Sequence, residues 1–345
     1  MSIPQRSRIP RLGTPRRRVL LTAILITLTT KTLPAATPSS DGLPPDVTPW
    51  WPSRYGQDDV LGTLNEITPA ITTAAAALVK RGKVIDLGRT LDADVPKFPG
   101  RYWQQTVDTS APYVNLRRPD ASAYGWGKNH LNWITEIQAG TFQVGTQLDS
   151  LGHLQIADRL YNGWRTRDVV EVWGLNKFGM EAVPPIITRG VLLDIAAYKG
   201  VVRLDKGYVI SVADVEGAAA KQGIIIKAGD AVLFHTGWGG LWGVNNTEFL
   251  AGEPGPGMAA IAWLYAKHIA LTGADTWSYG PVPGEDTSRP FLVPQTMYVK
   301  MGLVGLENLA TEALAASHIY EFMFTLTHAK TRGSTAAVIA PAAVY

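Results

Sequence analysis

The chain has 345 residues, 46% of them hydrophobic and 18% charged, so it can bury a substantial core and is not a largely disordered protein. It has no cysteine, which excludes disulfides, thiolate-bound zinc and a cysteine nucleophile. The formal net charge is +3, but the first 40 residues hold seven basic side chains and no acidic one. Without those seven charges the chain carries −4, which excludes a basic face for nucleic acid.

Residues 1–36 have the three parts of an export signal: a basic start, an apolar run over residues 19–30, and small residues ending at Ala36. A transmembrane helix needs about 20 apolar residues, so this run is too short to remain as an anchor. We therefore expect cleavage, a periplasmic or secreted product, and no membrane contact afterwards. The arginines at 16–18 suit either the Sec or the twin-arginine route. Residues 37–49, rich in Pro, Ser and Asp, are predicted to be a linker.

Residues 50–345 are predicted to form a single domain, because no repeat and no Pro, Gly or Ser linker interrupts them. The first element is a helix over residues 70–80, with Thr68 as its cap, Pro69 in its first turn and Gly82 as its stop. Strands are predicted at residues 83–87, 190–195, 231–236, 269–273, 321–327 and 336–340, and further helices at residues 213–222 and 258–267. This alternation indicates the α/β class.

The most informative pattern is the stretch Gln-Val-Gly-Thr-Gln-Leu-Asp-Ser-Leu-Gly-His from Gln143 to His153. If its first half is extended, Gln143, Gln147 and Asp149 alternate onto one face, where a carboxylate and two amide oxygens could hold a cation. Gly152 permits a turn that brings His153 to the same point. A plainer interpretation also stands: strand glutamines that satisfy backbone groups, and an aspartate that caps a turn.

The same stretch resembles the signature of the cyclase family of metal-dependent hydrolases, which includes bacterial kynurenine formamidase and isatin hydrolase. That signature is His-x-Gly-Thr-His-x-Asp, with a further His four residues later. Here it takes the form Gly-Thr-Gln-x-Asp, in which Gln143 and Gln147 replace two metal-binding histidines. His153 stands where the family has its acid/base histidine, and a downstream Tyr-Asn-Gly at residues 161–163 matches the same variant.

Further segments, in the same order along the chain, are similar to other elements of the family. They are Trp50-Trp-Pro-Ser-Arg-Tyr-Gly56, Gly62-Thr-Leu-Asn65, Thr236-Gly-Trp238, Gly273-Ala-Asp-Thr276 and Gly302-Leu-Val-Gly-Leu-Glu-Asn-Leu309. In the last segment the resemblance makes Glu307 a metal ligand. One departure lies at Pro294 and Gln295, where the family has another histidine of the metal site.

The resemblance implies a swivelling β/β/α-type domain with a mixed sheet, assembled as a homodimer or homotetramer. It implies His153 as acid/base and a divalent cation held by Asp149, Gln147, Gln143 and Glu307. Because oxygen ligands suit harder cations than imidazole does, we expect manganese rather than zinc, with a metal-free site as the alternative. The expected reaction is hydrolysis of a small cyclic or formyl amide. A lactone hydrolase, or a periplasmic small-ligand-binding protein without turnover, stays open.

Contacts to the substrate are expected from aromatic and polar residues in loop-like contexts. The chain has 11 tryptophans, most of which should lie in the core, and an aromatic wall would suit a flat ligand. Our candidates are Trp126, His235, Trp238, Trp277 and Gln295. The sequence lacks the motifs Gly-x-Ser-x-Gly and His-Glu-x-x-His and the Walker sequence.

Overall fold

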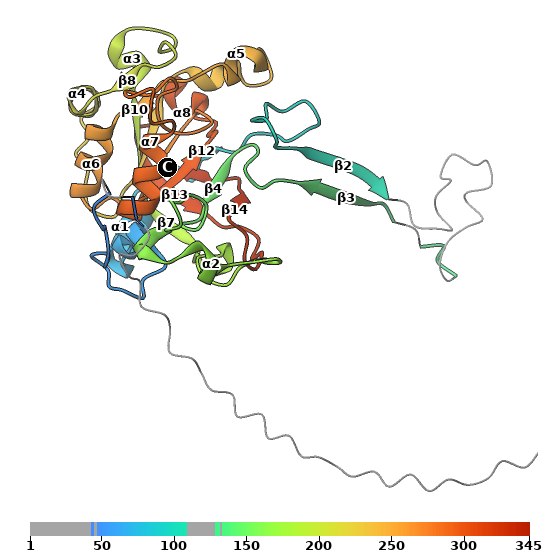
Figure 1. Cartoon of the computed structure of the whole chain (residues 1–345). Helices are drawn as coiled ribbons and strands as arrows, with labels where there is room; N and C mark the ends of the chain where they lie inside the picture. Colours follow the sequence, from blue (N-terminus) through green and yellow to red (C-terminus); the bar gives the residue numbers. More distant parts are fainter. Residues whose placement is uncertain (1–42, 45–46, 109–127, 132) are drawn as a thin grey trace, which may run out of the picture. The chain divides into compact units, whose positions relative to one another are not determined.

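Nine strands form one mixed sheet, and the four at its centre run parallel (Figure 1). Across the sheet they are β1 (Val84–Asp86), β15 (Ala342–Val344), β13 (Glu321–Leu326), β7 (Ile186–Asp194), β9 (Ala231–His235), β11 (Leu271–Ala274), β12 (Val304–Glu307), β4 (Gln147–Asp149) and β14 (Ala336–Val338). β7, β9, β11 and β12 pair in parallel, and the strands outside them pair antiparallel. Central strands are covered on both faces, so their sequences are continuous runs of mostly apolar residues. β9, with all five residues buried, is an example.

The computed structural model describes residues 43–44, 47–108, 128–131 and 133–345. These residues belong to one folding unit, which confirms the predicted single α/β domain with a mixed sheet. The predicted export signal, part of the predicted linker and the candidate Trp126 lie outside the described residues.

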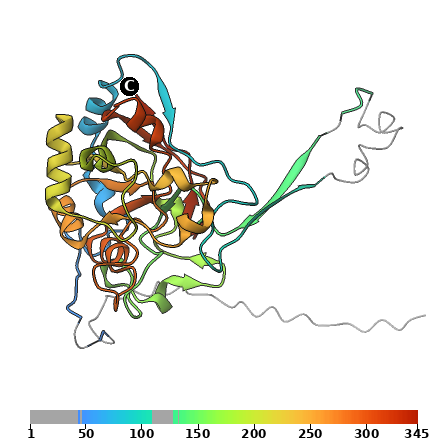
Figure 2. The ribbon, with the colours of Figure 1, turned by 90° about the horizontal axis from the view of Figure 1, so that it is seen from above.

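Three small sheets accompany the large one. β8 (Val209–Ile210) pairs in parallel with β10 (Gly255–Pro256), and β5 (Val170–Glu171) pairs antiparallel with β6 (Gly174–Leu175). β2 (Trp103–Asp108) and β3 (Thr135–Gly140) form an antiparallel pair that extends away from the large sheet, and every residue of β3 is exposed (Figure 2).

Short helices surround the large sheet. The α-helices are α1 (Pro69–Ala76), α2 (Thr166–Val169), α3 (Ile195–Lys199), α4 (Val212–Gln222), α5 (Asn246–Leu250), α6 (Met258–Ala266), α7 (Leu292–Gln295) and α8 (Glu312–Ala316). The 3-10 helices are η1 (Gly62–Glu66), η3 (Tyr161–Gly163), η4 (Met180–Ala182) and η5 (Trp238–Leu241), and η6 (Thr296–Met301) is a π-helix. In the described part of the chain, none of the helices combines the length and apolarity that a bilayer span requires.

Local sequence signals fix the helix starts well. Thr68 caps α1 as predicted, because its hydroxyl accepts from the amide of Ile71 at 3.3 Å. α1 ends at Ala76 rather than at residue 80. The amides of Arg81 and Lys83 donate instead to the carbonyl oxygen of Tyr345, at 3.2 Å each, so the end of the chain draws this segment into an extended path beside the sheet.

The parallel strands place chemistry at their carboxyl ends, where α/β sheets usually bind ligands. β9 ends at His235, and β12 ends at Glu307. β4 runs antiparallel to β12, with Gln147 directly opposite Glu307. The signature stretch and the late glutamate are therefore neighbours in the sheet, although 160 residues separate these two positions in the chain.

Candidate active site

Two buried carboxylates meet at the β4–β12 pair. Gln147 and Asp149 lie two residues apart on β4, so their side chains point to the same face of the sheet. The Gln147 amide nitrogen donates to Glu307 Oε2 at 2.7 Å and to Asp149 Oδ2 at 3.4 Å. One amide group therefore bridges both acids, and all three side chains are at least 93% buried.

The segment before β4 turns, and this turn aims Gln143 at His153. Extended structure is confined to residues 147–149, and Gly145 has φ +73°, a value that suits glycine. The Gln143 amide nitrogen lies 3.2 Å from His153 Nδ1, and the Gln143 Oε1 atom accepts from Arg101 Nη1 at 2.7 Å. Gln143 thus orients the imidazole, and Nε2 of His153 is the ring nitrogen left to exchange protons with a bound molecule.

Burial disfavours the ionised forms of both acids, and the charge of Asp149 adds to this effect at Glu307. The pKa of Asp149 is raised chiefly by burial, against the lowering effects of His153, the Gln147 hydrogen bond and Arg101. The pKa of Glu307 is raised well above its ordinary value, first by burial and then by the charges of Asp149 and Glu253. A cation between the two acids would relieve both effects.

The oxygen donors of this site fit a hard divalent cation. Gln147 Oε1 and Asp149 Oδ1 are buried and have no hydrogen-bond partner among the described residues. Buried oxygens of this kind normally find a partner, so they are candidate ligands. Across the described residues, no three His, Cys, Asp or Glu side chains converge as a metal-binding group. Carboxylate and amide oxygens without imidazole suit magnesium or manganese better than zinc.

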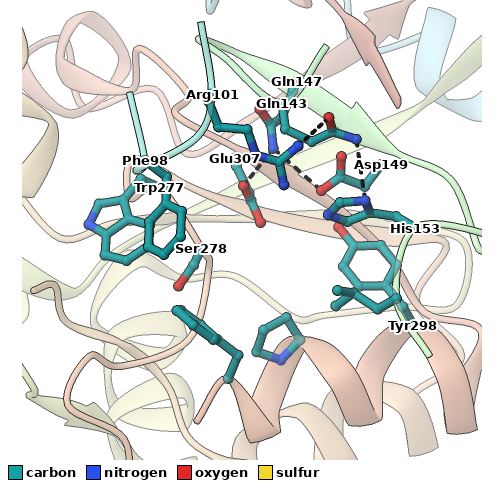
Figure 3. A pocket seen from close by; sticks show the side chains of 13 residues that line it. Phe98, Arg101, Gln143, Gln147, Asp149, His153, Trp277, Ser278, Tyr298 and Glu307 are labelled. Carbon is teal, nitrogen blue, oxygen red and sulfur yellow. Dashed lines mark hydrogen bonds between the residues drawn. The ribbon is translucent and has the colours of Figure 1, made fainter. Parts of the chain in front are cut away.

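These groups lie in a cavity of about 170 Å³ with an aromatic wall (Figure 3). The rings of Phe98 and Trp277 stack with their centroids 5.4 Å apart, and Phe291 meets each of them edge-on at 6.1 Å. Phe98 and Phe291 are 43% and 40% exposed, which leaves this wall open to an entering ligand. In Figure 3, Phe98 and Trp277 lie on one side of the cavity with Arg101 and Glu307 next to them, and Asp149 and His153 lie on the other side. This arrangement suits a small flat molecule with one polar end.

A third buried acid holds the aromatic wall in place. Glu253 accepts from the backbone amides of Trp277 and Ser278 at 2.6 and 2.9 Å, and from the Ser278 hydroxyl at 2.6 Å. Complete burial raises its pKa to about 8, although these three hydrogen bonds oppose the shift. Glu253 therefore fixes the loop after β11 that presents Trp277 to the cavity.

Tyr298, on the π-helix η6, lines the same cavity. Its side chain is fully buried, and its hydroxyl has no hydrogen-bond partner among the described residues. Burial, and next the charges of Asp149 and Glu307, raise the pKa of Tyr298 well above 10, so the phenol keeps its proton. A π-helix is an uncommon element that often marks a functional site.

The structure brings together most of the predicted site residues. Gln143, Gln147, Asp149, His153 and Glu307 all line the cavity, as does Trp277.

Three other candidates lie elsewhere. His235 Nδ1 contacts the Thr311 hydroxyl at 2.8 Å, and Trp238 is buried with its indole nitrogen donating to the Phe249 carbonyl at 3.1 Å. Gln295 donates to the Gln155 carbonyl at 3.0 Å, and its neighbour Pro294 lines the cavity instead. Each of the three side chains thus makes a hydrogen bond to the surrounding chain.

Several residues in or beside the cavity were not among the candidates predicted from the sequence. They are Phe98, Arg101, Glu253, Phe291 and Tyr298. Phe98 and Arg101 lie outside every motif recognised in the sequence. Glu253 does not line the cavity but hydrogen-bonds the loop at Trp277, 24 residues further along the chain. Of these residues, Tyr298 alone could have been suggested by the sequence. It lies between Gln295, where the resemblance expects a histidine, and Glu307.

Comparison with known proteins gives a consistent result. Residues 85–281 match the family model of the cyclases. The chain is similar to a solved structure described as a novel cyclase, with 28% identity, a TM-score of 0.75, and coverage of 85% of this chain and 96% of the other. Isatin hydrolase A from Ralstonia solanacearum matches with 21% identity and a TM-score of 0.56, over 80% of this chain and 97% of that one.

An isatin hydrolase bound to the product analogue thioisatinate matches with 17% identity and a TM-score of 0.56, over 81% and 99% of the two chains. No curated protein matches the chain.

Proposed function

Since this chain belongs to the cyclase family, we propose that it is a hydrolase that cleaves the C–N bond of a small cyclic amide or formamide. The observation that carries this proposal is the meeting of two buried carboxylates, an imidazole and an aromatic wall in one cavity. The fold that the chain shares with isatin hydrolases supports it.

The reaction would use a divalent cation held by Asp149, Glu307 and Oε1 of Gln147, with manganese preferred to zinc. The two raised pKa values and the two unpaired oxygens support this assignment. When bound, such a cation polarises a carbonyl group and acidifies water.

His153 is the acid/base in this proposal. The oxygen of a water molecule bonds to the amide carbon while the water proton passes to Nε2 of His153. The C–N bond then breaks, and its electron pair takes that proton onto the leaving nitrogen. Nε2 can accept this proton only when the neutral imidazole carries its own proton on Nδ1, so in both stages the Gln143 amide would have to be turned over and accept from Nδ1 through its oxygen.

The aromatic wall selects flat substrates. A ring laid against Trp277 and Phe98 would place its amide toward Asp149 and His153 on the opposite side of the cavity. Hydrolysis of an aromatic lactone would use the same residues and is the second candidate reaction.

The test combines metal content with turnover. The protein, purified without chelator, is assayed with isatin, N-formylkynurenine and a simple lactone, each with added Mn²⁺, with Zn²⁺ and with EDTA. We expect Mn²⁺-stimulated hydrolysis that His153→Gln lowers by about 10²- to 10⁴-fold. His328→Gln, which changes a partly exposed histidine outside the cavity, is the matched control. No turnover of any substrate under any condition would favour a protein that binds small ligands without hydrolysing them.

A further inference from the structure

Arg101 lines the cavity and lies two residues before the start of β2. Its backbone amide donates to the Phe98 carbonyl oxygen at 2.9 Å, which closes a tight turn. That turn sends the side chains of Phe98 and Arg101 into the same cavity. Figure 3 shows the guanidinium between Gln143 and Glu307, on the side of the cavity next to Trp277 and Phe98.

The Arg101 guanidinium has few hydrogen-bond partners among the described residues. Within the described chain its side chain makes one hydrogen bond, to Gln143 Oε1, and no ion pair with Asp149 or Glu307. A guanidinium has five N–H donors arranged as a planar fork, and that fork matches a carboxylate in a two-point contact. Several donors therefore stay free for a ligand.

The surroundings of Arg101 define the kind of ligand. Among the described residues that line the cavity, Arg101 is the one lysine or arginine. The stacked rings of Phe98 and Trp277 offer an apolar surface beside it. An aromatic ring that carries an anionic group could pack against the aromatic wall and bind the Arg101 guanidinium at the same time.

Building on the proposed hydrolase function, we propose that Arg101 is a specificity-determining residue that binds the carboxylate of an aromatic ligand. The site would accordingly favour aryl amides that carry a carboxylate near the amide, and it would retain the aryl carboxylate that ring opening of a cyclic amide releases. Trp277 and Phe98 hold the ring, while Arg101 holds the anionic end.

A purely structural role for Arg101 makes a different prediction. As a counter-charge, it lowers the pKa of both Asp149 and Glu307, so its loss alone would weaken the fold and cation binding. That role would leave the preference between an acid and its uncharged amide unchanged. The ratio of the two affinities therefore separates ligand recognition from structural support.

The experiment measures binding without turnover. The affinities of 2-aminobenzoate and of its neutral counterpart 2-aminobenzamide are determined by calorimetry for the wild type, Arg101→Gln and Arg101→Lys. We expect the wild type to prefer the acid by about tenfold or more, as for a charge-assisted hydrogen bond. Arg101→Gln should lose the preference, and Arg101→Lys should keep part of it. Arg167→Gln, which removes a 72% exposed side chain, is the control.

Turnover supplies the second readout. For N-formylanthranilate, Arg101→Gln should raise KM about tenfold, and for uncharged formanilide it should leave KM within about twofold. Equal affinity of the wild type for acid and amide, or an unchanged preference in Arg101→Gln, would overturn the assignment. If the wild type hydrolyses nothing yet shows the Arg101-dependent preference, the proposed reaction fails while the carboxylate site stands.

Discussion

Glu253 makes the stability of this protein depend on pH in a way that one substitution can expose. The side chain is fully buried and holds the amides of Trp277 and Ser278, and burial raises its pKa from 4.5 to about 8. The folded state therefore keeps a proton that the unfolded chain releases. Glu253→Gln removes the ionisable group and preserves the shape of the side chain.

The direction and the size of this pH effect on the unfolding free energy follow from the pKa of Glu253 in the unfolded and in the folded state. Below pH 4.5 the group is protonated in both states and costs nothing, and between pH 4.5 and about 8 the unfolded state gains stability as it ionises. Above that range the cost is complete, at about 5 kcal/mol of unfolding free energy. Between pH 5 and pH 9 the wild type should therefore lose about 4 kcal/mol relative to the Glu253→Gln variant.

Urea unfolding followed by tryptophan fluorescence at pH 5, 7 and 9 measures this difference. Glu248→Gln is the control, because the side chain of Glu248 is 42% exposed and pairs with that of Arg203 near the surface, so it should show no such trend. If the unfolding free energies of wild type and Glu253→Gln stay parallel across this range, the buried acid is not protonated at neutral pH and the reasoning is wrong.

Three further predictions concern the cation, the aromatic wall and the backbone. Mn²⁺ at 100 times its dissociation constant should stabilise the wild type by about 2.7 kcal/mol, and Asp149→Asn should abolish the shift seen in a thermal melt; an equal shift in both proteins would place the cation elsewhere. Trp277→Leu should raise KM for aryl substrates about tenfold with little change in kcat, and unchanged steady-state kinetics would remove the wall from substrate binding. Gly62→Ala should lower the unfolding free energy by about 2 kcal/mol or more, because φ is +58° and the added Cβ would overlap the Gly302 carbonyl oxygen. Urea unfolding measures this loss, and a loss below about 0.5 kcal/mol would contradict the prediction.

Local chemistry made several elements predictable. The Ser211 hydroxyl accepts from the Asp214 amide at 3.1 Å and Gly223 ends α4 with φ +69°, so both ends of that helix are encoded within a few residues. The buried runs of β7, β9 and β11 were visible because central parallel strands need apolar side chains on both faces.

Long-range contacts explain the mistaken and missed residues. His235 ends β9 and Trp238 follows it, at the end of a strand where ligand-binding residues often lie, but Thr311 and Phe249 provide their hydrogen-bond partners. Those partners come from segments that no local pattern connects to them. Arg101 enters the cavity only because β2 and β3 pair and bring Gln143 beside it.

The sequence by itself determined the α/β class, the family resemblance and the common face of Gln147 and Asp149, because side chains two residues apart in a strand point the same way. The expected extension back to Gln143 was wrong, because the chain turns at Gly145. The tertiary structure alone decided that Glu307 lies opposite Gln147, that Arg101 and Trp277 face the same cavity, and that Glu253 supports its wall. The physical reason is that sheet register and loop anchoring join residues far apart in the chain, as with Gln147 and Glu307 at 160 positions, and these depend on the packing of the whole core.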